Sequence, residues 1–383
     1  MTEKPAINYG LEGVYVDESA ISKVDGQNGR LWYRGYSIED LAEKSNYEEV
    51  CYLLLNGKLP SKVEFEEFSR KLRNRRDLPA EVKDLIRVMA PRSHPMDVMR
   101  TATSMLIMYD SDPNNQENSA TLDKVITLIA KLPSIAAATG RFREKKEYIP
   151  PDDSLSIPAN FLYMLTGKKP TKFESKLIAL MFILHAEHST NASTFSVLVT
   201  ASTLADVYAA TTSGIGTLKG PLHGGADEAA LSMMNAIGNP DNTENYIEEA
   251  LEGKQRIMGF GHRVYKTYDP RAKLVRSYLE ESLTKEPSDE VRRLLQIALR
   301  AEKLMIDKLG KTKGIWPNID FFAGPLYRVL GIEGQMFTPI FVASRMAGWG
   351  SHIVEYWHNN KLVRPVEWYV GQLDLKYVPL NER

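Results

Sequence analysis

The chain has 383 residues, of which 43% are hydrophobic and 25% charged, and its formal net charge is −1. A balance this close to neutral provides no overall positive field for nucleic acid or an anionic membrane surface. The one cysteine, Cys51, excludes an internal disulfide and a cysteine-based zinc site. Since the first residues also lack the apolar stretch of a secretory signal, we expect a globular cytoplasmic protein.

The first predicted element is a short β-ribbon within residues 13–35. Two runs of strand-forming residues, 14–16 and 31–33, flank a turn rich in glycine and asparagine at residues 25–29. Ser37 is a predicted N-cap, and from there onward the apolar segments have helical rather than alternating patterns. The predicted helical segments include residues 99–108, 122–135, 177–184, 195–210, 226–237, 291–309 and 338–358. The sequence therefore predicts an all-α fold, and its longest apolar run, of eight residues, is far too short for a membrane span.

Two of the seven histidines stand in glycine-rich segments 39 positions apart. The first, His223, precedes Gly224 and Gly225 and then a predicted helix, so we expect it at a helix N-terminus. The positive end of the helix dipole disfavours the charged imidazolium there. A neutral ring can donate a hydrogen bond to a carbonyl oxygen that becomes an enolate. The alternative interpretation is a capping or core histidine.

The second, His262, follows a Gly-Phe-Gly loop at residues 259–261. The backbone N–H groups of such a loop can hold a phosphate or a ribose. No strand pattern precedes the loop and a third glycine is missing, so it is not a dinucleotide fingerprint. Asp269 and Pro270 then predict the start of a helix, from which Arg271 can point at whatever the loop binds. The alternative interpretation is a surface turn.

A carboxylate, Asp320, stands among aromatic and apolar residues in the segment 316–322. Burial there would raise its pKa and make it a stronger base. Two histidines and a carboxylate are the groups needed to take a proton from a carbon and give one to an oxygen. The alternative role for Asp320 is the N-cap of a helix over residues 322–330.

Further candidates suit an anion or a metal. His185 and His188 flank Glu187 at the end of an apolar helix, which suggests zinc, although the His-Glu-x-x-His order and an evident third ligand are missing. Core packing and the binding of an anionic substrate are the alternatives for this segment. Arg345 lies in an apolar helix and must be paired or bind an anion. Arg364, in the C-terminal tail, is either a carboxylate ligand or plain surface.

Taken together, these segments resemble the citrate synthase family over essentially the whole chain. Their order and spacing make the resemblance specific, although each motif alone would be weak. The segments that carry it are Trp-Tyr-Arg-Gly-Tyr at 32–36, His-Pro-Met-Asp at 94–97, His-Ala-Glu-His at 185–188 with Asn191, the motifs at 220–225, 259–266, 269–271 and 318–321, and Phe-Thr-Pro at 337–339 with Arg345, Gly348, Trp349, Arg364 and Pro365.

The resemblance implies an all-α homodimer of the shorter type, with an active site in the cleft between two helical domains. The large domain would comprise residues 1–224 and 331–383, and the small domain would comprise residues 225–330. Closure of the cleft between them would exclude water from the reaction.

The resemblance also implies residue roles in condensing acetyl-CoA with oxaloacetate to give citrate and CoA, the first step of the tricarboxylic acid cycle. Asp320 would remove a methyl proton, neutral His223 would stabilise the enol, and His262 would protonate the forming alkoxide. Oxaloacetate would be held by His188, Arg271, Arg345 and, from the other subunit, Arg364. CoA would be held by the backbone of Arg256, Ile257, Met258, Gly259, Phe260 and Gly261. No metal and no further cofactor is implied.

Three alternatives remain. A 2-methylcitrate synthase performs the same chemistry on propionyl-CoA, and one extra methyl group in the acyl pocket is worth only about 1–3 kcal/mol. From a different class, a helical metalloprotein would use His185, Glu187 and His188. A non-catalytic protein of the same fold is disfavoured, because all three proton-handling residues are present together.

Overall fold

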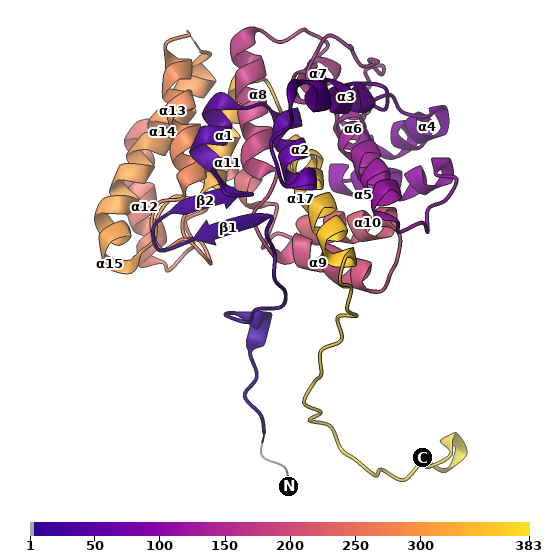
Figure 1. Cartoon of the computed structure of the whole chain (residues 1–383). Helices are drawn as coiled ribbons and strands as arrows, with labels where there is room; N and C mark the ends of the chain where they lie inside the picture. Colours follow the sequence, from indigo (N-terminus) through magenta and orange to yellow (C-terminus); the bar gives the residue numbers. More distant parts are fainter. Residues whose placement is uncertain (1–3, 286) are drawn as a thin grey trace.

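The computed structural model describes residues 4–285 and 287–383 and is largely helical (Figure 1). Its strands are β1 (Ser22–Asp25), β2 (Arg30–Tyr33) and β3 (Tyr36–Ser37). Its α-helices are α1 (Ile38–Lys44), α2 (Tyr47–Asn56), α3 (Lys62–Arg73), α4 (Ala80–Met89), α5 (Pro95–Met105), α6 (Asn118–Arg143), α7 (Ile157–Thr166), α8 (Lys172–His185), α9 (Ala192–Ser202), α10 (Val207–Leu218), α11 (Ala226–Ile237), α12 (Thr243–Glu252), α13 (Pro270–Leu283), α14 (Asp289–Met305), α15 (Lys311–Lys313), α16 (Ile319–Val329) and α17 (Phe337–Trp357). Short turns of helix are η1 (Tyr9–Leu11), η2 (Leu106–Tyr109), η3 (Pro240–Asn242), η4 (Ile306–Gly310), η5 (Gly334–Met336) and η6 (Leu380–Glu382). The prediction of an all-α fold is confirmed.

Many helix ends coincide with capping residues that are visible in the sequence. Ser37 accepts a hydrogen bond from the Asp40 amide at the start of α1, which confirms the predicted cap. At the start of α8, Thr171 and Glu174 form a reciprocal capping box. Gly57 ends α2 in the left-handed conformation that favours glycine. Local sequence therefore sets where these helices begin and end.

The predicted β-ribbon exists, but its first strand was placed wrongly at residues 14–16. The strand β1 pairs antiparallel with β2 through the turn at residues 26–29, so that Asp25 lies opposite Arg30. Residues 14–16 pair with no strand in the described part of the chain, and the Tyr15 side chain is 98% exposed. A short turn places its two flanking segments side by side, and the segment 14–16 is too far from the turn to gain that pairing.

The predicted helix over residues 195–210 is in fact two helices, α9 and α10. Leu204 adopts a φ of 64° between them, which ends the first helix. Asp206 then caps α10 by accepting a hydrogen bond of 2.9 Å from the Ala209 amide. Both helices pack on α17, so the apolar pattern continues across the break and hides it from periodicity alone.

The helices form two groups. The long helix α17 is buried over most of its length against α2, α6, α8, α9 and α10. A second group, α11, α13, α14 and α16, packs mainly on its own members, and Figure 1 shows α12 to α15 together on one side in orange. The helices of the second group all lie within residues 225–330, the predicted small domain. The domain boundaries at 224/225 and 330/331 stay a prediction.

One helix, α6, is long and apolar enough to cross a membrane by length and composition alone. However, 83% of its most apolar window is buried inside the protein, where α6 packs against α5, α7 and α17. Its apolar residues are therefore explained by burial in the core.

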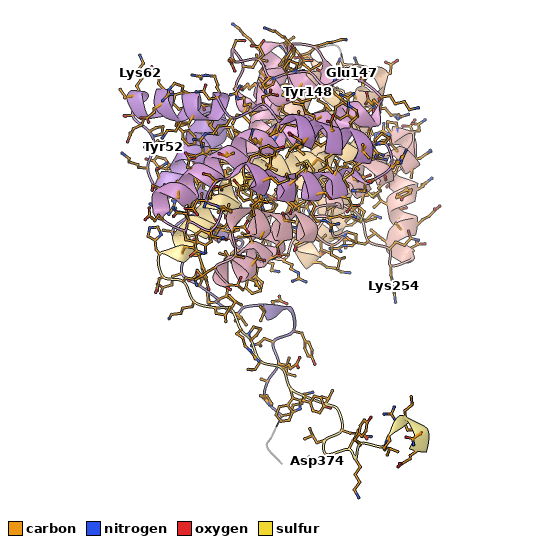
Figure 2. All side chains as sticks on the ribbon, turned by 90° about the vertical axis from the view of Figure 1, so that its right-hand side faces the viewer. Tyr52, Lys62, Glu147, Tyr148, Lys254 and Asp374 are labelled. Atoms are coloured by element: carbon orange, nitrogen blue, oxygen red, sulfur yellow. The ribbon has the colours of Figure 1, made fainter. Side chains whose placement is uncertain are left out.

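Both ends of the chain extend away from the helical body. Figures 1 and 2 show the segment before β1 and the segment after α17 leaving the body on the same side. Large apolar side chains in the C-terminal segment are exposed, among them Leu362, Val366, Tyr369, Val370, Leu373, Leu375 and Tyr377. These side chains have no apolar surface to cover within the described chain.

Candidate active site

His223 lies in the turn that precedes α11, as predicted. Its side chain is half-buried. The Ser193 amide, at the start of α9, donates a hydrogen bond of 3.3 Å to His223 Nε2, and Ser193 Oγ lies 2.9 Å from the same atom. Because an amide N–H can only donate, Nε2 accepts and the neutral ring carries its proton on Nδ1. Burial and the charge of Arg345 lower the pKa of His223 to about 4, so the ring is neutral at pH 7.

His262 is held by its other ring nitrogen. Its Nδ1 accepts hydrogen bonds from the backbone N–H groups of Val264, at 3.0 Å, and Tyr265, at 3.1 Å. The neutral ring therefore carries its proton on Nε2. Burial, reinforced by the charge of Arg271, lowers the pKa of His262 to about 4. Each histidine thus keeps one N–H group, on opposite ring nitrogens, for a ligand.

The glycine loop at residues 259–261 is paired with the segment just before α16. The N–H of Gly261 donates to the carbonyl at position 316 at 2.8 Å, and the carbonyl of Gly259 accepts from the N–H at position 318 at 2.9 Å. Gly259 has a φ of 79°, and a Cβ there would lie 2.7 Å from the Cα of Phe321. Only glycine permits this approach, which fixes the loop against the start of α16.

Asp320 lies in the first turn of α16 but is not its N-cap, so that alternative role is wrong. The cap is Asn318, whose side-chain oxygen accepts a hydrogen bond of 3.1 Å from the Asp320 amide. Burial raises the pKa of Asp320 to about 6, against the opposing attraction of Arg271 and Arg345. The carboxyl group is therefore ionised at neutral pH and is a stronger base than an exposed aspartate.

Arg271 is the second residue of α13, directly after Pro270, as predicted. The Asp269 carboxylate caps this helix and also accepts from Arg271 Nε at 3.1 Å and Nη2 at 2.8 Å. Asp269 Oδ2 accepts a further hydrogen bond of 3.2 Å from the Ile319 amide, next to Asp320. One buried carboxylate thus orients the guanidinium group and fixes the start of the helix that carries the carboxylate base.

Arg345 lies within α17 and is only 1% exposed. Its Nε donates a hydrogen bond of 2.7 Å to the carbonyl of His185, and the guanidinium group lies 4.6 Å from the centre of the Phe341 ring. Burial lowers the pKa of Arg345 to about 10, which leaves the side chain charged at neutral pH. A charged guanidinium group held this way is suited to an anionic ligand.

His188 is buried in the loop between α8 and α9. Its ring centre is 5.3 Å from that of His262. Burial, reinforced by the charges of Arg271 and Arg345, lowers the pKa of His188, and both charges also act on Asp320. The arginines, the histidine and the carboxylate base therefore belong to one electrostatic site.

The side chains of the metalloprotein alternative do not converge on one point. His185 Nδ1 lies 2.9 Å from the carbonyl of Met181, while Glu187 Oε1 lies 3.1 Å from His352 Nε2. His188 faces His262 instead. Among residues 4–285 and 287–383, no three histidine, cysteine or acidic side chains are grouped so that they could hold a metal ion.

The predicted CoA-binding residues lie beside His262, whereas Arg364 lies apart from the site. Ile257, Gly259 and Phe260 are buried, Met258 and Gly261 are half-buried, and Arg256 is exposed. The loop can therefore offer mainly backbone groups to a ligand. The exposed Arg364 donates a hydrogen bond of 3.0 Å to the carbonyl of its neighbour, Pro365.

Two surface hollows lie elsewhere, where α6 and α7 or α11 meet the end of α16 and η5. Their volumes are about 410 and 520 Å³, and none of the predicted site residues lines either one. The candidate site is therefore defined by hydrogen bonds and charge rather than by these hollows.

Sequence analysis missed three residues that hold the site together. Ser193 contacts His223, which is 30 positions away in the sequence, and no local pattern predicts such a contact. Tyr265 Oη lies 3.2 Å from His188 Nε2, and the two residues are 77 positions apart in the sequence. Asp269 was interpreted only as a helix cap. A carboxylate two positions before an arginine at a helix start could have suggested the two hydrogen bonds that Arg271 donates to Asp269.

The chain matches the family model of the citrate synthase C-terminal domain over residues 10–366. A citrate synthase of Synechocystis sp. is 44% identical and is aligned over 100% of this chain and 96% of its own. The 2-methylcitrate synthase 2 of Corynebacterium glutamicum is 40% identical over 98% of both chains. The solved structure of a citrate synthase from Thermoplasma acidophilum, a ternary complex with carboxymethyl coenzyme A and oxaloacetate, has a TM-score of 0.93 at 35% identity and covers 99% of this chain and 100% of its own. The chain therefore belongs to the citrate synthase family, whose all-α fold it shares.

Proposed function

We propose that the chain condenses acetyl-CoA with oxaloacetate and hydrolyses the resulting citryl-CoA to citrate and CoA. The observation that carries this proposal is the protonation pattern of three side chains. Asp320 is ionised near neutral pH, while His223 and His262 are neutral and keep N–H groups on opposite ring nitrogens. This set provides one base and two hydrogen-bond donors without a metal ion.

The first step is removal of a methyl proton from acetyl-CoA by the Asp320 carboxylate. A thioester α-proton is so weakly acidic that the developing enolate oxygen must be stabilised at the same time. His223 supplies that stabilisation by donating its Nδ1–H to the oxygen, because its Nε2 is already taken by Ser193. One positioned donor of this kind contributes about 3–4 kcal/mol to the transition state.

The second step forms the carbon–carbon bond. The enolate carbon attacks the ketone carbon of oxaloacetate, and His262 gives its Nε2 proton to the alkoxide oxygen that becomes the hydroxyl of citrate. The proton that Asp320 has taken up balances the one that His262 gives. Arg271, Arg345 and His188 hold the two carboxylates and the ketone of oxaloacetate. The two hydrogen bonds from Arg271 to Asp269 keep the guanidinium group in place. The backbone of residues 256–261 then holds CoA close to His262.

The assay for this proposal is CoA release with oxaloacetate and either acetyl-CoA or propionyl-CoA. We expect a higher kcat/KM with acetyl-CoA. A clear preference for propionyl-CoA would instead assign the chain to 2-methylcitrate synthesis, the activity in the name of one of its relatives. No CoA release with either substrate would contradict both assignments.

We further propose that the active form is a homodimer in which Arg364 completes the oxaloacetate site of the partner subunit. The exposed apolar side chains of the C-terminal segment support this proposal, since a surface must cover them. Arg364 lies at the start of that segment and hydrogen-bonds only its own neighbour within the described chain. A partner subunit would supply both the missing surface and a ligand for this guanidinium group.

Mixed dimers test the shared site. Neither an Asp320→Asn chain nor an Arg364→Ala chain should be active alone. In a heterodimer one site takes Asp320 from one chain and Arg364 from the other, so it is intact. Random exchange gives half heterodimers with one intact site each, so we expect recovery of about one quarter of parent activity. Exchange of subunits without recovered activity would show that Arg364 serves its own chain.

A further inference from the structure

The turn of the β-ribbon lies directly against the loop that follows His262, although about 240 positions separate them. The Lys266 amide donates a hydrogen bond of 2.8 Å to the carbonyl of Gly26. A Cβ on Gly26 would lie 2.0 Å from the carbonyl oxygen of Val264 and 2.6 Å from its carbonyl carbon. Both are backbone atoms, so neither can swing away as the end of a side chain would. Figure 1 shows the turn end of β1 and β2 pointing toward the segments around α12 and α15.

Gly26 is required for space and not for conformation. Its φ lies outside the left-handed range, so no left-handed conformation calls for glycine there. What alanine cannot do is approach the Val264 carbonyl as closely. Position 26 thus accepts no side chain while the loop keeps its place.

The part of the loop that touches the ribbon is also the part that holds the His262 ring. The amides of Val264 and Tyr265 donate to His262 Nδ1 at 3.0 and 3.1 Å. Val264 contacts Gly26 through its carbonyl group, and Lys266 contacts it through its amide. The connection from the ribbon to the catalytic ring therefore runs through two adjacent stretches of backbone and depends on no flexible side chain.

The other end of β1 contacts the segment that carries His188. Ser22 Oγ donates to Glu187 Oε1 at 2.9 Å and accepts from the Ser189 amide at 3.0 Å. Those two residues flank His188. Four residues of extended strand, about 13 Å long, thus join the segment that carries one substrate ligand to the loop that carries His262.

We propose that β1 and its turn are a positioning element for the reaction, in which Gly26 seats the backbone of residues 264–266 so that the His262 ring presents Nε2–H to the substrate. This inference rests on the proposed role of His262. It assigns a function to a segment that lies outside every catalytic motif. A shift of the loop of about 1 Å is enough to reduce a catalytic rate up to 100-fold.

The test is Gly26→Ala in the full-length chain, compared with two controls in the same ribbon. Gln27→Ala changes an exposed side chain of the same turn. Gly35→Ala strains the ribbon, since Gly35 has a φ of 87°, but an added Cβ there meets no atom within 4 Å. We expect kcat to fall about 10-fold or more in Gly26→Ala alone. We also expect faster hydrogen exchange at the amides of residues 262–268, and a changed ¹⁵N signature of the His262 ring.

A second variant covers the case in which Gly26→Ala does not fold. Asp25 closes the turn by accepting from the Asn28 amide at 3.0 Å and from its side chain at 2.8 Å. Asp25→Ala loosens the turn without adding atoms, so it should cause a smaller change of the same kind in rate and in exchange.

Two outcomes would overturn the proposal. One is a folded Gly26→Ala protein, or in its place Asp25→Ala, with parent kcat and parent exchange at residues 262–268. The other is equal loss in Gly26→Ala and Gly35→Ala with exchange raised throughout the chain, which would mean a general effect on folding. Normal turnover by His262→Asn would contradict the proposed function instead, and the exchange data would still decide whether the ribbon holds the loop.

Discussion

The turn before α11 and the loop before α13 each present a neutral histidine, but they hold it by opposite nitrogens and by different means. His262 is held by amides two and three residues further along its own loop. His223 is held by Ser193, from a helix that lies 30 positions away in the sequence. The difference means that the His262 ring is set by local backbone, whereas the His223 ring depends on the packing of α9 against the turn.

The largest expected loss of kcat comes from removing Asp320, the proposed base that acts together with both histidines. Asp320→Asn should lower kcat by about 10²–10⁴-fold, because the carboxylate acts in the transition state. The KM for oxaloacetate should change little. Near-normal turnover would remove Asp320 from the mechanism.

The pH dependence of the parent enzyme should report the same carboxylate. Its pKa is raised to about 6, so a fall of pH below that value protonates the base, and kcat should decline. A pH profile of kcat that stays flat to about pH 4.5 would contradict this assignment.

The next effect tests how His223 is held. His223→Ala should lower kcat by about 10²–10³-fold with an unchanged circular dichroism spectrum. Ser193→Ala should cost about 10-fold, because His223 Nε2 keeps the backbone amide at position 193 but loses the Ser193 Oγ contact of 2.9 Å that helps to orient the ring. Ser196→Ala is the matched control, since that serine of the same helix bonds to Ser213 instead. Equal activity of the two serine variants would show that Ser193 does not position the ring.

A smaller effect is expected from Arg345, which we propose binds oxaloacetate. Arg345→Lys keeps the charge but loses the planar fork, so the KM for oxaloacetate should rise about 10-fold. An unchanged KM would mean that Arg345 serves only to hold the carbonyl of His185.

The smallest effect concerns stability at the start of α11. Asp227 is 3% exposed, and burial together with the nearby Asp320 charge raises its pKa well above the ordinary value. The folded state therefore keeps a proton that the unfolded chain loses above about pH 4, so stability declines as pH rises from there toward the folded pKa. Asp227→Asn should raise the thermal midpoint by a few degrees at pH about 7.5 and by less at pH about 5. A loss of stability at both values would mean that the carboxylate is ionised and paired.

Sequence reasoning singled out the candidate site residues from local signals, but it did not find the residues that support them. Gly261 beside His262, and Pro270 before Arg271, are local signals, and the structure confirms the predicted helix start at Pro270. The contact between Gly26 and Val264 joins distant segments, and no pattern within either one contains it.

Errors in the predicted fold have a similar origin. The strand predicted at residues 14–16 has strand-forming residues but lies too far from the turn to be paired. The break at Leu204 is invisible to periodicity because α9 and α10 bury their apolar faces on the same helix. In both cases the structure depends on which segments pack or pair with each other, and residue type alone does not reveal that.

The most direct test of this account is the protonation of the two rings, followed by NMR of ¹⁵N-histidine-labelled protein. His223→Ala and His262→Ala variants would assign the two signals among the seven histidines. The account predicts that both rings stay neutral to about pH 5, with the proton of His223 on Nδ1 and that of His262 on Nε2. Two rings with the same tautomer, or a ring that is protonated at pH about 6.5, would contradict it.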